Sequence, residues 1–147
     1  MKYPVKGGIG VPSESAAECF EFAFDRRMAR PLALLGIRPD NCRLMLGPSR
    51  LEVHYGPWTV RTTLDNVAGA ELTGPYSAWR AIGPRVSMAD RGLTFGTNAA
   101  RGVCIRFHEP VAGIEPAGRI RHPGLTLTLA DPDLAALRLR EVSAVAR

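Results

Sequence analysis

Arginine and aromatic residues gather in one part of the chain, between Gly74 and Gly124, where seven arginines accompany three acidic residues. Guanidinium groups bind carboxylates and phosphates through paired hydrogen bonds, and aromatic rings offer flat faces for stacking. Two segments are the candidates for this chemistry, residues 74–85 and 110–124. We predict ligand binding there by Tyr76, Trp79, Arg80, Arg85, Arg119, Arg121 and His122.

A purely structural role for the same residues is an open alternative. Tyr76 and Trp79 can cover one end of a barrel while the arginines point to solvent, because aromatic residues between strands serve either purpose. The chain has a formal net charge of +5 and a pI of about 9.6. A positive field favours anionic partners, although net charge by itself reports on solubility rather than on function.

Patterns typical of catalysis or metal binding are weak in this sequence. Cys104 and His108 share one face of a strand, but four residues span ~13 Å, too far for a thiol and its base. The histidines His54, His108 and His122 follow no metal-ligand spacing. We therefore predict no catalytic residue, no metal site and no cofactor, although a contact of Cys104 with a histidine distant in sequence stays open.

Apolar and polar residues alternate at period two in several short segments, which predicts strands. Glycine, proline, asparagine or aspartate stands between most of these segments, as turns require. The expected strands cover residues 18–25, 42–46, 51–55, 58–63, 67–72, 85–89, 93–97, 103–108 and 125–129. Short strands at near-regular spacing favour an antiparallel barrel or sandwich.

Two helices are expected beside the strands. The first covers residues 26–35, and Gly36 is suited to end it. The second begins after Asp131, whose side chain can cap a helix, and continues to Ala146. It is loosely amphipathic, and its apolar side carries Leu134, Leu137, Val142 and Val145.

A single domain accounts for the 147 residues, with a core of its own. Residues 1–17 show no period and are expected to form an irregular arm. A strand and a short helix follow in residues 18–36, then a β-meander with its final helix in residues 42–146. The fold class is mainly β, of the α+β kind, an antiparallel barrel or sandwich closed by a C-terminal helix.

The three cysteines, an odd number without CxxC spacing, indicate reduced thiols. No run approaches 18 apolar residues, and no apolar segment follows the N-terminal lysines. We therefore expect no transmembrane segment and no secretory signal, and we place the protein in the cytoplasm.

Two stretches resemble a known family. Residues 61–72, RTTLDNVAGAEL, resemble the corner between early strands of bacterial pleckstrin-homology-like domains, and residues 125–134, LTLTLADPDL, resemble their last strand and capping helix. The resemblance covers residues 42–146, and the chain is also similar to conserved hypothetical proteins of actinobacteria. The resemblance to pleckstrin-homology-like domains implies a scaffold that binds peptides, proteins or anionic headgroups and has no catalytic residues.

The sequence thus predicts a non-catalytic binding or adaptor module that contacts an acidic protein segment or an anionic ligand through residues 74–85 and 110–124. A second hypothesis is a helix-grip barrel that encloses a small apolar ligand near His54, Tyr55 or His108, as a carrier or an enzyme. Charge-driven binding of nucleic acid is a weaker alternative. Peripheral membrane contact and a homodimer formed through exposed strand edges also stay open.

Overall fold

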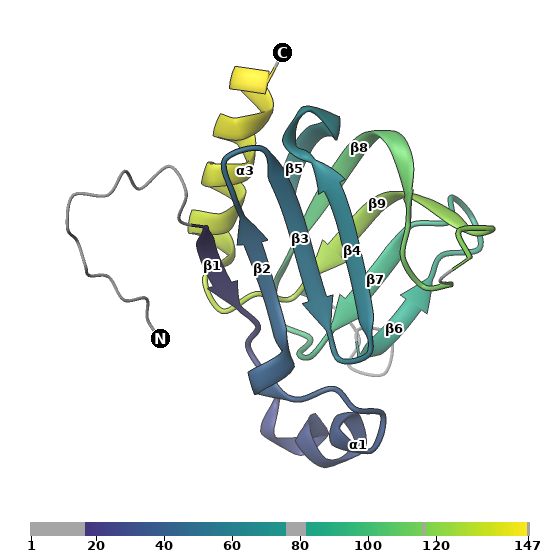
Figure 1. The fold of residues 1–147 in the computed structure, drawn as a ribbon. Coiled ribbons are helices and arrows are strands. Elements are labelled where there is room, and N and C mark those ends of the chain that lie inside the picture. Colours follow the sequence, from purple (N-terminus) through teal and green to yellow (C-terminus); the bar gives the residue numbers. More distant parts are fainter. Residues whose placement is uncertain (1–16, 76–81, 116, 147) are drawn as a thin grey trace.

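Two β-sheets and a C-terminal helix make up the computed structural model, which describes residues 17–75, 82–115 and 117–146 (Figure 1). The first sheet has the order β1-β2-β3-β4, with β1 (Glu18–Glu21), β2 (Cys42–Leu46), β3 (Arg50–Tyr55) and β4 (Trp58–Thr63). The second has the order β5-β8-β9-β7-β6, with β5 (Val67–Thr73), β6 (Gly83–Val86), β7 (Leu93–Gly96), β8 (Gly102–Ala112) and β9 (Arg121–Leu127). The α-helices are α1 (Ala29–Leu34) and α3 (Pro132–Ala146), and short 3₁₀ turns are η3 (Arg26–Met28), η4 (Pro39–Asn41) and η5 (Leu64–Asn66).

The mainly β class with a C-terminal helix is confirmed. In β3 the burial alternates along the strand, with Leu51, Val53 and Tyr55 on the inner face. Between the sheets, the ring of Tyr55 stacks on that of Phe95 of β7, with centroids 4.4 Å apart. Apolar side chains from both inner faces therefore form one core, which is why the period-two pattern identified these strands.

The second sheet departs from the predicted antiparallel arrangement. Strand β7 runs parallel to β9, with Leu93 opposite Leu125, and the order β5-β8-β9-β7-β6 is not consecutive in sequence. The β6–β7 hairpin lies at the far edge of the sheet, and β8 returns to pair with β5. A pattern of alternating residues locates strands but does not determine which strands become neighbours.

The first strand is shorter than predicted. Strand β1 ends at Glu21, and Phe22 makes a single bridge to Leu129 of the other half of the fold. Beyond it the chain bonds to a buried pair of threonines: Thr97 Oγ1 donates to the Ala23 carbonyl at 2.6 Å and lies 2.9 Å from Thr128 Oγ1. The phenylalanine alternation therefore continues past the strand, because this segment stays packed against the second sheet.

The predicted loop over residues 110–124 is also wrong in extent. Strand β8 continues to Ala112 and β9 begins at Arg121, so residues 113–120 alone connect them. The β8–β9 register shifts between Arg106 and Val111. This bulge interrupts the alternation, which hid the second half of β8 from the sequence pattern.

Helix α3 starts as predicted and packs through a different side. The Asp131 carboxylate accepts a hydrogen bond from the Leu134 amide at 3.2 Å, so Asp131 is the N-cap. Leu134 and Leu137 are 45% and 51% exposed, and the buried residues include Pro132, Ala135, Ala136, Leu139 and Ser143. Small residues let the helix lie close to the sheets, so the buried side was not the most apolar one.

Helix α3 lies between one edge of each sheet (Figure 1). Its Arg138 forms an ion pair with Glu18 of β1 at 2.8 Å. Its Arg140 donates through Nε to the Ala70 carbonyl of β5 at 2.9 Å. The helix thus packs along the β5 edge and is linked to β1 by an ion pair. Among the described residues, no helix combines the length and the hydropathy needed to cross a membrane.

Candidate functional site: a groove beside strand β4

An open groove of about 780 Å³ lies between β4, η5 and the second half of β8. Its size is in the range of ligand-binding sites. The lining is largely polar and comprises Thr59, Arg61, Thr62, Thr63, Asp65, Asn66, His108, Glu109, Pro110, Val111, Ala112, Gly113, Glu115 and Arg121. Of the residues predicted to bind a ligand, Arg121 lines it.

One wall of the groove is the free edge of β4. In the described part of the chain, β4 pairs with β3 alone, through a two-residue hairpin that places Tyr55 opposite Trp58. In such a hairpin every second residue directs its backbone N–H and C=O away from the partner strand. These residues in β4 are Thr59, Arg61 and Thr63, and all three line the groove.

The opposite wall is the bulged half of β8, which an asparagine holds in place. Asn66 of η5 donates from its side-chain amide to the Glu109 carbonyl at 2.9 Å and accepts from the Glu109 N–H at 2.8 Å. This pair of bonds reproduces those of a neighbouring strand. Gly113 closes the floor, since a Cβ built there would lie 3.0 Å from Val60 Cγ2.

Charges of both signs surround the groove. Arg61 donates to Glu52 on the outer face of the first sheet, and this hydrogen bond lowers the pKa of Glu52 below its ordinary value. Glu115 accepts from the backbone amides of Ala117 and Arg119 at 2.9 and 2.6 Å, which shapes the β8–β9 connection. Arg121 donates through Nε to the Pro110 carbonyl at 3.3 Å, which leaves its terminal nitrogens to face solvent.

The structure brings together two of the predicted arginines and separates a third. Arg119 and Arg121 are exposed at the β8–β9 connection, next to the groove. Arg85 lies on β6 opposite Thr94 of β7, which pairs with Thr126 of β9. Arg85 is therefore level with Thr126 of β9, which lies five residues and about 17 Å along the strand from Arg121. Tyr76, Trp79 and Arg80 lie outside the described residues.

His122 is a core residue and is not available to a surface ligand. It is 0% exposed. Its Nδ1 lies 2.7 Å from the Arg91 carbonyl, and its Nε2 lies 3.4 Å from the Ile114 amide. With Nδ1 donating and Nε2 accepting, a neutral imidazole satisfies both contacts. The prediction of ligand binding by His122 is therefore wrong, because the side chain of this β9 residue points between the sheets.

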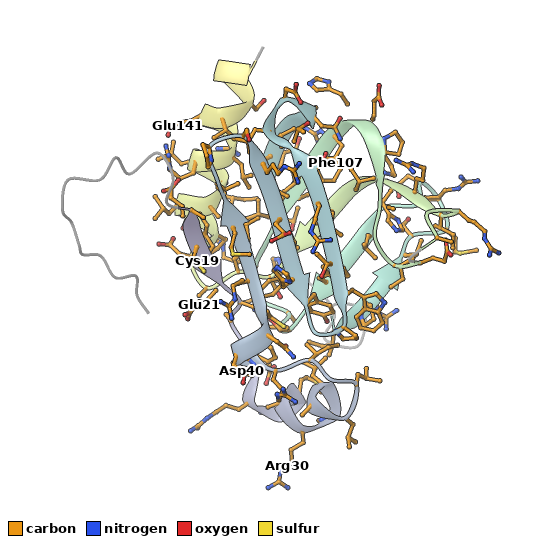
Figure 2. The ribbon with its side chains drawn as sticks, in the orientation of Figure 1. Cys19, Glu21, Arg30, Asp40, Phe107 and Glu141 are labelled. Atoms are coloured by element: carbon orange, nitrogen blue, oxygen red, sulfur yellow. The ribbon has the colours of Figure 1, made fainter. Side chains whose placement is uncertain are left out.

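The cysteines lie apart from the groove. Cys19 is exposed on β1 (Figure 2), Cys42 is buried and Cys104 is half-buried. Cys104 borders a shallow hollow of about 320 Å³ on the outer face of the second sheet. It makes no hydrogen bond to a histidine within the described residues. The same residues contain no group of three or more His, Cys, Asp or Glu arranged to hold a metal ion.

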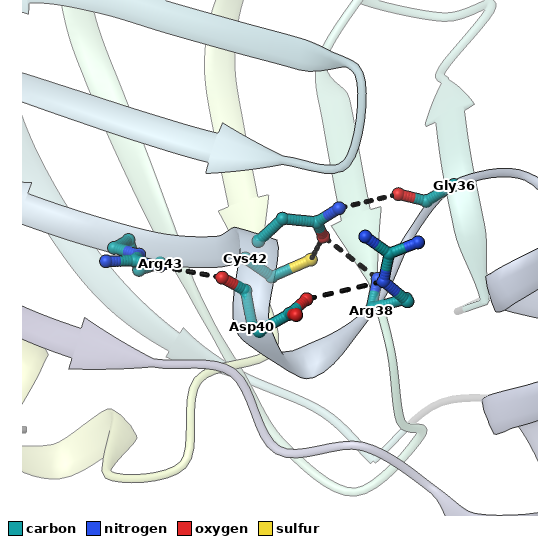
Figure 3. Close-up of polar contacts among 6 residues, drawn as sticks. Gly36, Arg38, Asp40, Cys42 and Arg43 are labelled. Carbon is teal, nitrogen blue, oxygen red and sulfur yellow. Dashed lines mark hydrogen bonds and ion pairs between the residues drawn. The ribbon is translucent and has the colours of Figure 1, made fainter.

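A compact polar turn precedes β2 (Figure 3). Asn41 donates from its side chain to the Gly36 carbonyl at 2.8 Å, and its Oδ1 accepts from the Arg38 amide at 2.9 Å. Arg43 donates to the Asp40 carbonyl at 2.7 Å. These internal bonds fix the entry into β2 and explain the polar residues there structurally. They also surround Cys42, whose burial raises its thiol pKa from 9.0 to about 11.

We expect the free energy of unfolding to decrease between pH 8 and pH 10, with a contribution of roughly 1 kcal/mol from Cys42. The folded pKa is raised, so the stabilisation is complete below pH 9 and is lost as the pH approaches 11. Urea unfolding at both pH values should show a smaller decrease for Cys42→Val than for the natural protein. Equal decreases would contradict the assignment.

Comparison of the chain with protein-family models, with curated protein sequences and with solved structures found no significant match in any of the three.

Proposed function

We propose that the protein is a non-catalytic binding module that holds an acidic protein segment in the groove beside β4. The observation that carries the proposal is the groove itself, which combines a strand edge with Arg121 in its lining, while Arg119 is exposed two residues before it. Arginine forks bind carboxylates with geometric specificity, so they favour acidic side chains over neutral ones.

A pleckstrin-homology-like scaffold and a cytoplasmic location belong to the same proposal. The consecutive order β2-β3-β4 and a last strand that leads into α3 support the scaffold. We propose, as parts of this scaffold, the closed barrel and the strand order of that family. A scaffold of this kind presents edges and loops rather than an interior site, which suits an adaptor.

The enclosed-ligand alternative receives less support from the geometry. Its three lining candidates do not converge: Tyr55 is 0% exposed in the core, His54 lies on the outer face beside Glu52, and His108 borders the groove. Fully buried side chains such as Tyr55 and Phe95 fill the space between the sheets. A carrier would instead need an internal cavity.

The proposal predicts that an eight-residue peptide alternating glutamate and valine binds, and that one alternating lysine and valine does not. Fluorescence anisotropy of the labelled peptides measures both. In the double variant Arg119→Ala/Arg121→Ala the dissociation constant should rise at least ten-fold, because a charged contact contributes about 1.5–3 kcal/mol. Equal binding of the two peptides would contradict the proposal.

A matched control has the same net charge as the double variant Arg119→Ala/Arg121→Ala. Arg26→Ala/Arg30→Ala also removes two positive charges, from exposed positions in η3 and α1, and α1 lies away from β8 and β9 (Figure 1). This control should bind the glutamate peptide as the natural protein does. An equal loss in both double variants would mean that the overall field, and not the groove, attracts the peptide.

A further inference from the structure

The edges of the two sheets differ in how far they are protected. Helix α3 packs along the β5 edge, where Arg140 bonds to the Ala70 carbonyl; at the β1 edge its Arg138 pairs with Glu18, and the Ala130 amide donates to the Glu21 carbonyl. Strand β6 has Pro84 in its middle, and proline cannot donate a backbone hydrogen bond. These are the common devices by which proteins prevent another strand from adding to a sheet. Within the described residues, strand β4 has neither a covering helix nor a proline along Trp58–Thr63.

We propose that β4 accepts a partner's extended segment as a fifth, antiparallel strand of the first sheet. This inference rests on the proposed function and specifies how the acidic segment is held. Backbone groups of Thr59, Arg61 and Thr63 would bond to the added strand, and the groove borders β4 from Thr59 to Thr63. Main-chain bonds then supply affinity, while alternate side chains supply specificity.

The two faces of β4 define the chemistry of the partner. Thr59 and Arg61 lie on the outer face, in register with His54 and Glu52 of β3. Val60 is buried and Thr62 half-buried on the inner face, so the added residues facing inward must be small or apolar. On the outer face an acidic residue opposite Arg61 would share its guanidinium with Glu52. The expected segment alternates acidic and apolar residues.

A second copy of this chain fits the edge less well than an acidic segment. Antiparallel pairing of two β4 strands over Thr59–Thr63, the register that pairs all three residues with outward backbone groups, places Arg61 directly opposite its own copy. Like charges in directly opposed positions destabilise a sheet. Arg61 thus disfavours pairing of β4 with a second copy and offers a contact to an acidic residue. For this reason we propose an acidic segment as the added strand.

Amide hydrogen exchange by NMR tests the strand addition directly. In the free protein the amides of Thr59, Arg61 and Thr63 should exchange quickly, and those of Val60 and Thr62 slowly, because the latter pair with β3. Saturation with the glutamate–valine peptide should slow exchange at the first three by at least ten-fold. Binding without this change would overturn the inference while leaving the proposed function intact.

Two modified probes give an independent readout that needs no protein variant. In an antiparallel added strand, the glutamates opposite Arg61 direct their N–H groups towards β4, so N-methylation of the glutamates should abolish binding. N-methylation of the valines should change the dissociation constant less than three-fold. If both N-methylated peptides bind as the unmodified peptide does, charge alone holds the peptide. If both lose binding equally, the result would also contradict pairing of the peptide with the β4 edge.

The protein-side variant is Thr59→Pro, which removes one outward donor and keeps all backbone hydrogen bonds to β3. It should weaken the glutamate peptide at least ten-fold while its circular dichroism stays that of the natural protein. If no acidic peptide binds at all, the proposed function and the strand addition both fail. A dimer that sedimentation equilibrium detects and Thr59→Pro abolishes would replace the acidic partner with a second copy.

Discussion

Substitution of Gly56 by alanine should lower the free energy of unfolding by about 3 kcal/mol, one of the largest effects expected in this protein. Gly56 occupies the turn between β3 and β4 with φ +56°, and an alanine Cβ would lie 2.8 Å from the Gly36 carbonyl oxygen. The left-handed backbone and the collision each oppose the side chain. Urea unfolding followed by tryptophan fluorescence measures the loss.

Two other glycines separate these causes. Gly36 has φ +84°, but a Cβ there meets its nearest atom at an ordinary 3.7 Å, so Gly36→Ala should cost about 1–2 kcal/mol. Gly69 has open space around it and no positive φ, so Gly69→Ala should change stability by less than ~0.5 kcal/mol. If Gly56→Ala lowers the free energy of unfolding no more than Gly36→Ala does, the close approach of residue 56 to Gly36 does not contribute to the loss.

The strands could be predicted from sequence because each has one buried face. Strand β4 was predicted with its observed bounds, Trp58–Thr63, and β2 likewise as Cys42–Leu46. Local alternation carries this information without reference to the rest of the fold. The pairing of β7 with β9 carries no such local signal, because it depends on where a distant hairpin packs.

The candidate site was predictable only in part, for a related reason. Arg119 and Arg121 stood out by composition, and the structure places Arg121 in the lining of the groove and Arg119 two residues before it. The groove itself joins β4 to residues more than 40 positions later, through Asn66 and Glu109. Asn66 was visible in the sequence only as a turn residue, and its role as a substitute for a strand depends on a bulge that alternation cannot show.

The same separation in sequence explains why the free edge of β4 was missed. An edge is defined by the absence of a neighbouring strand, and the neighbours of β4 depend on the complete topology. Had β5 paired with β4 as the next strand of a meander, Thr59 and Arg61 would have been covered. Instead η5 turns the chain into the second sheet, and β5 pairs with β8. The candidate site is thus a consequence of the change of sheet.

Replacement of Tyr55 by alanine should cost about 4 kcal/mol, comparable to the loss of other large buried aromatic residues. The ring lies against those of Phe22, Trp58 and Phe95, with centroids 5.8, 6.2 and 4.4 Å away. These rings join β3 to the other half of the fold. Thermal unfolding measured by circular dichroism should show a decrease in Tm of roughly 15 °C.

Tyr55→Phe isolates the hydroxyl and should cost about 1–2 kcal/mol. The hydroxyl donates to the Gly96 carbonyl at 2.7 Å and accepts from the Gly83 amide, so it ties β3 to the paired β6 and β7. Phenylalanine keeps the ring and removes both hydrogen bonds of the hydroxyl. If Tyr55→Phe is neutral, β3 is held by ring packing alone. A cost equal to that of Tyr55→Ala would assign the attachment of β6 and β7 to this one hydroxyl.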